Sequence, residues 1–348
     1  MKSLLLTAVP CAALAAAPMK AAAQSSVTVY GLFDAATRHA TNTDASRASR
    51  KTMEDGIFTG SRLGFRGRED LGDGMSAVFT LESGFDPSTG VSLQGTPVGD
   101  YGQVTAPSRF WGREVHVGLR GGWGGVTLGR QYTVAHTLAA RFQSQGNPNS
   151  TAHSLFSSHH IARQDNMLRL DTTIGGVELL ASNTFGEQTG SSANGSWALG
   201  AGYAKGAVSL GAYVQRMKNL TGTETREIIG AGGNFKFNGD LALFGGVMQR
   251  DDAVSPQKNR AWTFGANYQV TPLLMLSAQH YRDDQSGGAT LDGARTVDWL
   301  VASYRFSVRT DVYAVLDRNK VTGGYTRPAF MGTMGTQSGY VIGLRHRF

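Results

Sequence analysis

The sequence predicts an all-β fold, a sixteen-stranded antiparallel transmembrane β-barrel. Three observations predict it. Segments of about ten residues, in which apolar and polar side chains alternate, recur from residue 27 to the end of the chain. Short turns and long connections alternate between these segments, as in closed membrane barrels. After residue 24, no apolar run approaches the roughly 18 residues that a membrane helix needs, so any spanning must be done by strands.

The N-terminal segment has the three-part build of a secretory signal. Lys2 precedes an apolar run, residues 4–17, and the small residues 21–23 follow as a cleavage region. We therefore expect residues 1–23 to be a signal peptide and residues 24–348 to form the barrel domain.

Composition excludes several classes of function. The single cysteine, Cys11, lies in the predicted signal, so the mature chain has neither a disulfide framework nor a thiolate site. Loss of Lys2 and Lys20 with the signal lowers the formal net charge from +7 to +5. This charge is mild and no dense Lys/Arg run accompanies it, so nucleic acid is not an expected partner.

The hairpin between Ser61 and Phe85 is the clearest strand pair. Leu63 and Phe65 share one parity, whereas Arg62 and its neighbours at every second position form a cationic face. A polar turn, residues 69–74, leads into a second alternating strand. An apolar face can pack on the core of a soluble sheet or face lipid in a membrane barrel, so the hairpin alone does not distinguish these two folds.

The remaining segments settle the count. Polar connections follow the first strand up to residue 55 and the hairpin from residue 86 to residue 108. The sixteen predicted strands cover residues 27–38, 62–68, 76–82, 110–120, 126–130, 163–173, 177–185, 196–204, 208–214, 226–237, 241–250, 261–270, 273–282, 294–306, 310–319 and 339–348. An even number with asymmetric connections favours a closed barrel over a soluble β-sandwich or a secreted β-solenoid. Residues 131–162 have no alternating run, and so long a loop is usually functional.

Several motifs resemble one family. SSVTVYG at residues 25–31, SRLGFRG followed by EDLG, LESGF, VTLGRQY at residues 126–132 and the terminal GLRHRF resemble the trimeric general diffusion porins of β-proteobacteria, a Gram-negative outer-membrane porin family. The resemblance implies a homotrimer in the cell outer membrane, in contact with its lipid and lipopolysaccharide. It also implies that residues 131–162 are a third extracellular loop folded into the barrel. Phe348 is similar to the terminal aromatic residue that the barrel-assembly machinery reads.

The resemblance also implies which residues narrow the pore. An arginine ladder falls on Arg62, Arg113 and Arg163, with Glu82 on the opposite wall, and Arg66 shares the parity of Arg62. Any of these residues can instead be an ordinary side chain of a wet inner face. Further candidates for the lumen are Asp34, Arg38, Asp165, His136 and His153.

The expected function is passive diffusion of water, ions and small hydrophilic solutes. Residues 130–164 contain no Asp or Glu, so the constriction should be net positive and prefer small anionic or neutral solutes, more strongly if loop histidines gain protons toward pH 5. A substrate-specific anion channel, or a barrel that acts mainly as a surface adhesin or receptor, remains an alternative. HExxH, CxxC and G-x-S-x-G are absent from the sequence, so we expect no enzyme activity, cofactor or metal, and His159-His160 reads as an ordinary loop pair.

Overall fold

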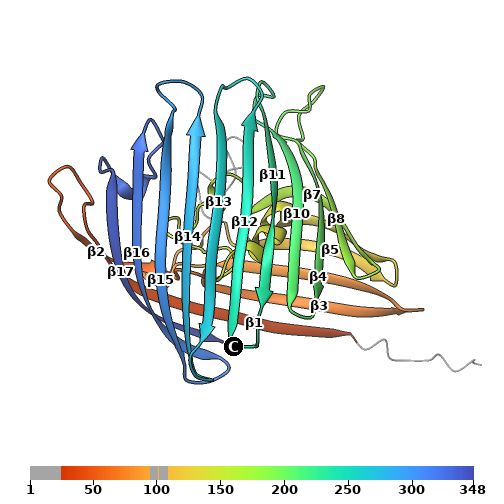
Figure 1. Ribbon diagram of the computed structural model, residues 1–348. Coiled ribbons are helices and arrows are strands. Elements are labelled where there is room, and N and C mark those ends of the chain that lie inside the picture. Colours follow the sequence, from red (N-terminus) through yellow and green to blue (C-terminus); the bar gives the residue numbers. More distant parts are fainter. Residues whose placement is uncertain (1–24, 95–100, 102–108) are drawn as a thin grey trace, which may run out of the picture.

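The structure is a computed structural model that describes residues 25–94, 101 and 109–348, so the predicted signal peptide lies outside the described residues (Figure 1). Strands dominate this part of the chain. They are β1 (Ser26–Ala40), β2 (Arg50–Asp55), β3 (Arg62–Gly72), β4 (Met75–Gly84), β5 (Glu114–Gly121), β6 (Gly124–Tyr132), β7 (Arg163–Ile174), β8 (Val177–Thr184), β9 (Ser196–Lys205), β10 (Val208–Lys218), β11 (Thr225–Lys236), β12 (Leu241–Asp252), β13 (Lys258–Gln269), β14 (Leu274–Ser286), β15 (Gly293–Arg305), β16 (Thr310–Gly323) and β17 (Thr336–Arg347).

The strands form one antiparallel sheet that closes on itself. Each strand from β3 onward pairs with the next along the chain, and β17 pairs with β1 from Leu32↔Arg347 to Ala40↔Gly339. Both β2 and β3 pair with β1, so these two strands occupy one position in the wall. The barrel therefore has sixteen strand positions, and the predicted fold class is confirmed (Figure 1).

The second strand position is interrupted, which the sequence did not reveal. The polar connection expected up to residue 55 contains β2, and residues 56–61 then turn away from the wall. Gly56 adopts a φ of 47°, in the left-handed region that favours glycine. Across the gap, the Asp34 N–H donates to Ser61 Oγ (3.0 Å) and the Ser61 hydroxyl donates back to the Asp34 carbonyl (3.1 Å). A hydroxyl thus replaces the missing ladder bonds of β1.

The outer face of the barrel is apolar, as the alternation predicts. Leu199, Phe264 and Ile342 expose 53%, 55% and 69% of their surface, and each faces away from the interior. Such a band suits contact with lipid tails. In the described part of the chain, no helix is both long enough and apolar enough to cross a membrane.

One long connection lies inside the barrel. We call residues 133–162, between β6 and β7, the inner loop. It contains α1 (Val134–Ala139), η2 (Ala140–Phe142) and η3 (Phe156–Ser158), whereas η4 (Ala329–Met331) belongs to the β16–β17 connection. Thr133 caps α1, because its side chain accepts a hydrogen bond from the His136 N–H (3.2 Å). The helix is visible within the barrel in Figure 1.

The inner loop packs against an apolar half of the inner wall. Its buried residues include Leu138, Phe142 and Phe156. They join a core cluster with inward-facing side chains of β8 to β16, among them Leu180, Tyr213, Ile228, Met248, Tyr281, Trp299 and Tyr313. Because the inner face of these strands mixes apolar side chains with polar ones such as Gln215 and Asp283, a period-2 pattern could not predict this half of the lumen.

Candidate pore constriction

Three arginines from different strands meet at the inner wall opposite this apolar half. Arg62 opens β3, Arg113 immediately precedes β5, and Arg163 opens β7. Arg113 Nε lies 2.5 Å from Glu82 Oε1, and Arg62 Nη1 lies 3.8 Å from the same oxygen. The structure thus brings together the three arginines of the predicted ladder with Glu82, which stands among them rather than on a separate wall.

Tyr132 joins the arginines, and sequence reasoning did not single it out. Arg113 Nη2 donates to the Tyr132 hydroxyl (2.9 Å), and Arg163 Nη2 donates to the same oxygen. The Arg163 guanidinium also lies over the Tyr132 ring, 4.2 Å from its centroid. The motif VTLGRQY contains this tyrosine, but only the fold shows that its hydroxyl links two guanidinium groups.

Burial differs among the members of this cluster. The Arg113 and Glu82 side chains are 3% and 5% exposed, so their ion pair is nearly dry, and the Tyr30 hydroxyl donates to the second Glu82 oxygen (2.9 Å). The Arg62 side chain stays 22% exposed. A buried pair loses stability when one partner is removed, whereas a partly exposed guanidinium is free to attract a passing ion.

A second carboxylate stands beside the arginines. Glu114 is the direct cross-strand neighbour of Glu82. Val117 and Leu119 are exposed on the outer face of β5, so the alternation turns Glu114 inward. Sequence reasoning did not place Glu114 in the site. Glu114 and Val117 have opposite parity in β5, so the Glu114 side chain must face the lumen once Val117 is known to face lipid.

Arg66 and Asp165 lie apart from the cluster. The Arg66 side chain is exposed, and its guanidinium carbon lies 5.2 Å from the centre of the Tyr30 ring. Arg66 follows Arg62 along β3 and is therefore nearer the short β3–β4 connection. Asp165 forms ion pairs with Arg109 (3.1 Å) and Arg130 (2.8 Å). Its charge is therefore balanced locally and does not oppose the three arginines.

Asp34, Arg38 and His153 point into the barrel but are covered. Asp34 is fully buried and accepts hydrogen bonds from the hydroxyls of Tyr313 (2.6 Å) and Thr59 (2.8 Å). Arg38 and His153 both contact the carboxylate of Asp317, at 2.7 Å and 3.2 Å. These three residues fasten the inner loop and the interrupted strand to the wall, and their side chains do not reach open space.

The loop histidines do not behave as the sequence suggested. His136 stacks on Tyr132 with ring centres 5.0 Å apart, and its Nδ1 lies 3.3 Å from Nε2 of His160. Burial lowers the pKa of His136 well below its usual value, and the adjacent His160 lowers it further. Burial, followed by the proximity of His159, lowers the pKa of His160 to about 3. Burial therefore disfavours protonation of both rings, and this pair does not support the gain of positive charge that we expected as the pH falls toward 5.

His159 makes a further contact between the inner loop and the wall. Its Nε2 lies 2.7 Å from Asp283 of β14, and Asp283 also accepts a hydrogen bond from the Tyr325 hydroxyl (2.6 Å). Within the described residues, no group of three or more His, Cys, Asp or Glu side chains is arranged to hold a metal ion.

Comparison with known proteins identifies the family. The family described as Gram-negative porin matches residues 10–324. An outer membrane porin protein of Bordetella pertussis is 38% identical in an alignment of 148 residues that covers 39% of this chain and 34% of the relative. A major outer membrane protein P.IB of Neisseria meningitidis is 33% identical over 126 residues, 35% of this chain and 33% of the relative. The matched part thus spans about a third of the length of these relatives.

Solved structures share the fold over nearly the whole chain. An anion-selective porin from Comamonas acidovorans superposes with a TM-score of 0.78 at 22% identity, covering 93% of this chain and all (100%) of that one. OmpT of Vibrio cholerae superposes with a TM-score of 0.69 at 16% identity, covering 95% and 99%. At these identities the structures support the barrel architecture alone. Because the family match extends over most of the sequence and the barrel agrees with it, the chain belongs to the Gram-negative porin family and is a protein of the outer membrane.

Proposed function

We propose that the protein is a passive diffusion channel for water, ions and small hydrophilic solutes. The observation that carries this proposal is the arrangement of the lumen. The inner loop is packed on β8 to β16, while Arg62, Arg113 and Arg163 gather on the opposite wall. A charged cluster that faces a loop inside a closed barrel is the arrangement expected of a selective constriction.

The constriction prefers anions. Of the described carboxylates, Glu82 alone forms an ion pair with any of these three arginines; Glu114 stands beside it, and Asp55 lies near Arg113 without an ion pair. The inner loop adds no acid, since residues 130–164 contain no Asp or Glu. A net positive ring attracts anions and repels cations. The preference weakens with salt, because the Debye length falls from about 10 Å at 0.1 M to 3 Å at 1 M.

The assembly follows from the family. We propose that residues 1–23 are removed as a signal peptide and that three barrels associate, as OmpT of Vibrio cholerae does in its trimer form. The proposed partners are outer-membrane lipid, lipopolysaccharide and the barrel-assembly machinery. Phe348 supports the last of these, because its backbone pairs with Gly31 in both directions (3.0 and 3.1 Å) while its side chain stays 51% exposed.

Planar-bilayer recording tests the channel and its selectivity together. In a KCl gradient, the zero-current potential of the wild type should show anion preference. Arg62→Ala should reduce the anion-to-cation permeability ratio about two- to fivefold, as a charge contributing up to about 1 kcal/mol at 4 Å in water would predict. The combined Arg62→Ala, Arg113→Ala and Arg163→Ala protein should lose the preference.

Arg318→Ala is the matched control, because this arginine is exposed on the outer face of β16, beside the inward-facing Asp317. It should leave the zero-current potential unchanged. Cation preference in the wild type, or an undiminished anion preference in the triple variant, would show that the cluster does not set selectivity. A correctly assembled trimer without conductance would instead favour a surface receptor.

A further inference from the structure

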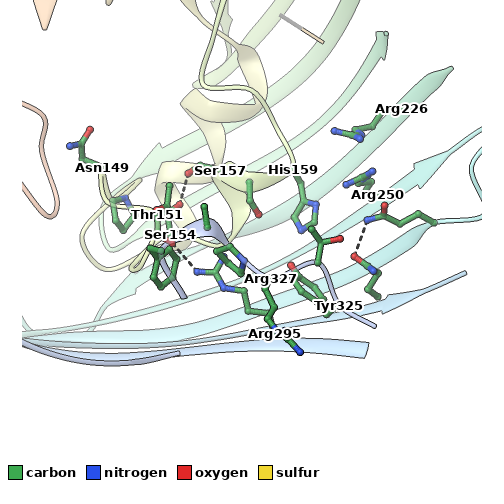
Figure 2. Close-up of a pocket in the computed structure, with 18 residues that line it drawn as sticks. Asn149, Thr151, Ser154, Ser157, His159, Arg226, Arg250, Arg295, Tyr325 and Arg327 are labelled. Atoms are coloured by element: carbon green, nitrogen blue, oxygen red, sulfur yellow. Dashed lines mark hydrogen bonds between the residues drawn. The ribbon is translucent and has the colours of Figure 1, made fainter. Parts of the chain in front are cut away.

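A cavity of about 550 Å³ lies between the inner loop and strands β11 to β15, away from the Arg62 cluster (Figure 2). Three parts of the described chain supply nearly all of its lining, to which the β12–β13 connection adds Gln257. The inner loop supplies residues from Pro148 to His159, the wall supplies Arg226, Arg250 and Arg295, and the β16–β17 connection supplies residues 325–330. Its volume is that of a site for a small organic molecule.

The surface of this cavity is cationic. Among the residues that the structure describes, four arginines line it, and no Asp or Glu does. Two carboxylates stand behind the lining. Asp252 contacts Arg226 Nε at 3.0 Å and also pairs with Arg250, while Asp283 is occupied by His159 and Tyr325. Four guanidinium groups against these two acids leave an excess of positive charge facing the cavity.

Arg295 is a buried cation on which Asp283 acts only from beyond ion-pair distance. It is 2% exposed, and its Nη2 donates to the Thr151 carbonyl (2.8 Å) and to Asn319 Oδ1 (2.9 Å). Among the described residues, no carboxylate lies within ion-pair distance of Arg295, and its buried Nε has no hydrogen-bond partner. An unpaired buried charge is costly, so an anion in the cavity would stabilise this side chain.

The arginines stand at two ends of the cavity. In Figure 2, Arg226 and Arg250 lie together on one side, Arg295 and Arg327 lie on the other, and His159 and Tyr325 stand between them. Apolar surface is supplied by Pro328, Ala329 and Phe330, whose ring lies 5.6 Å from the Arg295 guanidinium carbon. Guanidinium groups bind carboxylates through paired, charge-assisted hydrogen bonds.

We propose that this cavity is a binding site for a small organic dianion, a molecule with two acidic groups joined by a short apolar spacer. One acid lies against Arg226 and Arg250, the other lies against Arg295 and Arg327, and the spacer packs on Phe330. This site goes beyond the proposed diffusion channel. It is tested by equilibrium binding rather than by conductance, so its failure would leave the channel proposal untouched.

Isothermal titration calorimetry on the purified mature trimer in detergent, at low salt, provides the test. The probe is adipate, compared with hexanoate, which keeps one acid, and hexanediol, which keeps none. Adipate should bind with one site per chain. Hexanoate should bind about tenfold more weakly or worse, because one charged hydrogen-bonded pair is lost, and hexanediol should give no signal.

Variants locate the site. Arg327→Gln and Arg250→Gln, one at each end, should each weaken adipate about tenfold while bringing its affinity closer to that of hexanoate. Arg260→Gln, an exposed arginine on the outer face of β13, is the matched control and should bind adipate as the wild type does. Arg295→Gln serves only as a third variant, because Arg295 also holds Thr151 and Asn319 in place.

Three results would overturn the proposal. The first is absence of adipate binding to the wild type. The second is equal affinity for adipate and hexanoate, which would refute the two-ended site. The third is an unchanged adipate affinity in both Arg327→Gln and Arg250→Gln, which would place any binding elsewhere on the protein.

Discussion

Phe142 holds the middle of the inner loop against the barrel wall, and its removal should release that part of the loop. The side chain is fully buried between Tyr213 (ring centres 6.2 Å apart) and Phe156 (6.5 Å). Gly246 makes room for it, because a Cβ added there would stand 2.7 Å from the Phe142 Cβ. The ring therefore fits a recess that is built for it.

The size of the effect follows from burial. A buried Phe→Ala change costs about 3–5 kcal/mol, as transfer energy and a residual cavity. Phe142 takes no part in the hydrogen-bonded ladders of the barrel strands. The substitution should therefore lower the free energy with which the inner loop docks on the wall, and leave the strands in place. A loss of about 3 kcal/mol corresponds to a roughly hundredfold increase in the population of undocked loop.

Hydrogen–deuterium exchange with mass spectrometry measures this opening. Docking protects backbone bonds within the loop, such as Thr137 N–H to the Thr133 carbonyl (3.0 Å) and Gly146 N–H to the Gln143 carbonyl (3.0 Å). In Phe142→Ala, exchange of these amides should accelerate while that of the strands stays slow. Phe264→Ala, on the exposed outer face of β13, should change neither. Unchanged loop exchange in Phe142→Ala, or equal acceleration in the strands, would refute the packing argument.

Three further predictions concern the same loop. Deletion of residues 146–151 should raise single-channel conductance without preventing trimer assembly, because it removes the contacts of the loop tip with residues 55–57. Unchanged conductance would show that the loop tip does not narrow the passage. Acid should loosen the docked loop, because an undocked His160 takes up a proton near pH 6.5 whereas the docked ring does so only near pH 3. The docking free energy of the loop is therefore at its full value above pH 6.5 and falls below that pH, by about 2 kcal/mol at pH 5. Loop exchange should then accelerate from pH 7 to pH 5 after correction for intrinsic rates, and His160→Gln should reduce that difference. Gly200→Val should displace α1, because even a Cβ there would lie 2.4 Å from Leu138 Cδ1; unaltered conductance and loop exchange would contradict this.

The sequence predicted the barrel because lipid imposes a simple rule on every strand. Outward positions such as Leu199 and Phe264 must be apolar, and this fixes strand positions and parity through period 2. Strand ends are less well determined. The strand expected from residue 110 begins at Glu114, since the chain before it bends inward to bring Arg113 to Glu82.

The interior was less predictable because its partners are distant in sequence. Ile57 and Phe58 pack into the barrel from the interruption of the second strand, with the Phe58 ring 5.3 Å from that of Trp299. Nothing local distinguishes these residues from an ordinary loop. The assignment of Arg62, Arg113 and Arg163 came from resemblance to a family, whereas their joint contact with Glu82 and Tyr132 required the fold.

The apolar half of the inner wall has a consequence for biogenesis. Strands β8 to β16 carry apolar side chains on both faces, and the inner loop, together with Ile57 and Phe58, covers the inward set. That loop contacts Asp55 of β2 at one end of the chain and β15 and β16 near the other, so it reaches its final place only after these distant strands have come together. Until then, one half of the wall of a nascent barrel has a polar inner face. The other half exposes apolar side chains on both its inner and its outer face. Such an intermediate is prone to self-association, and shielding it during insertion protects the future lumen as well as the future lipid surface.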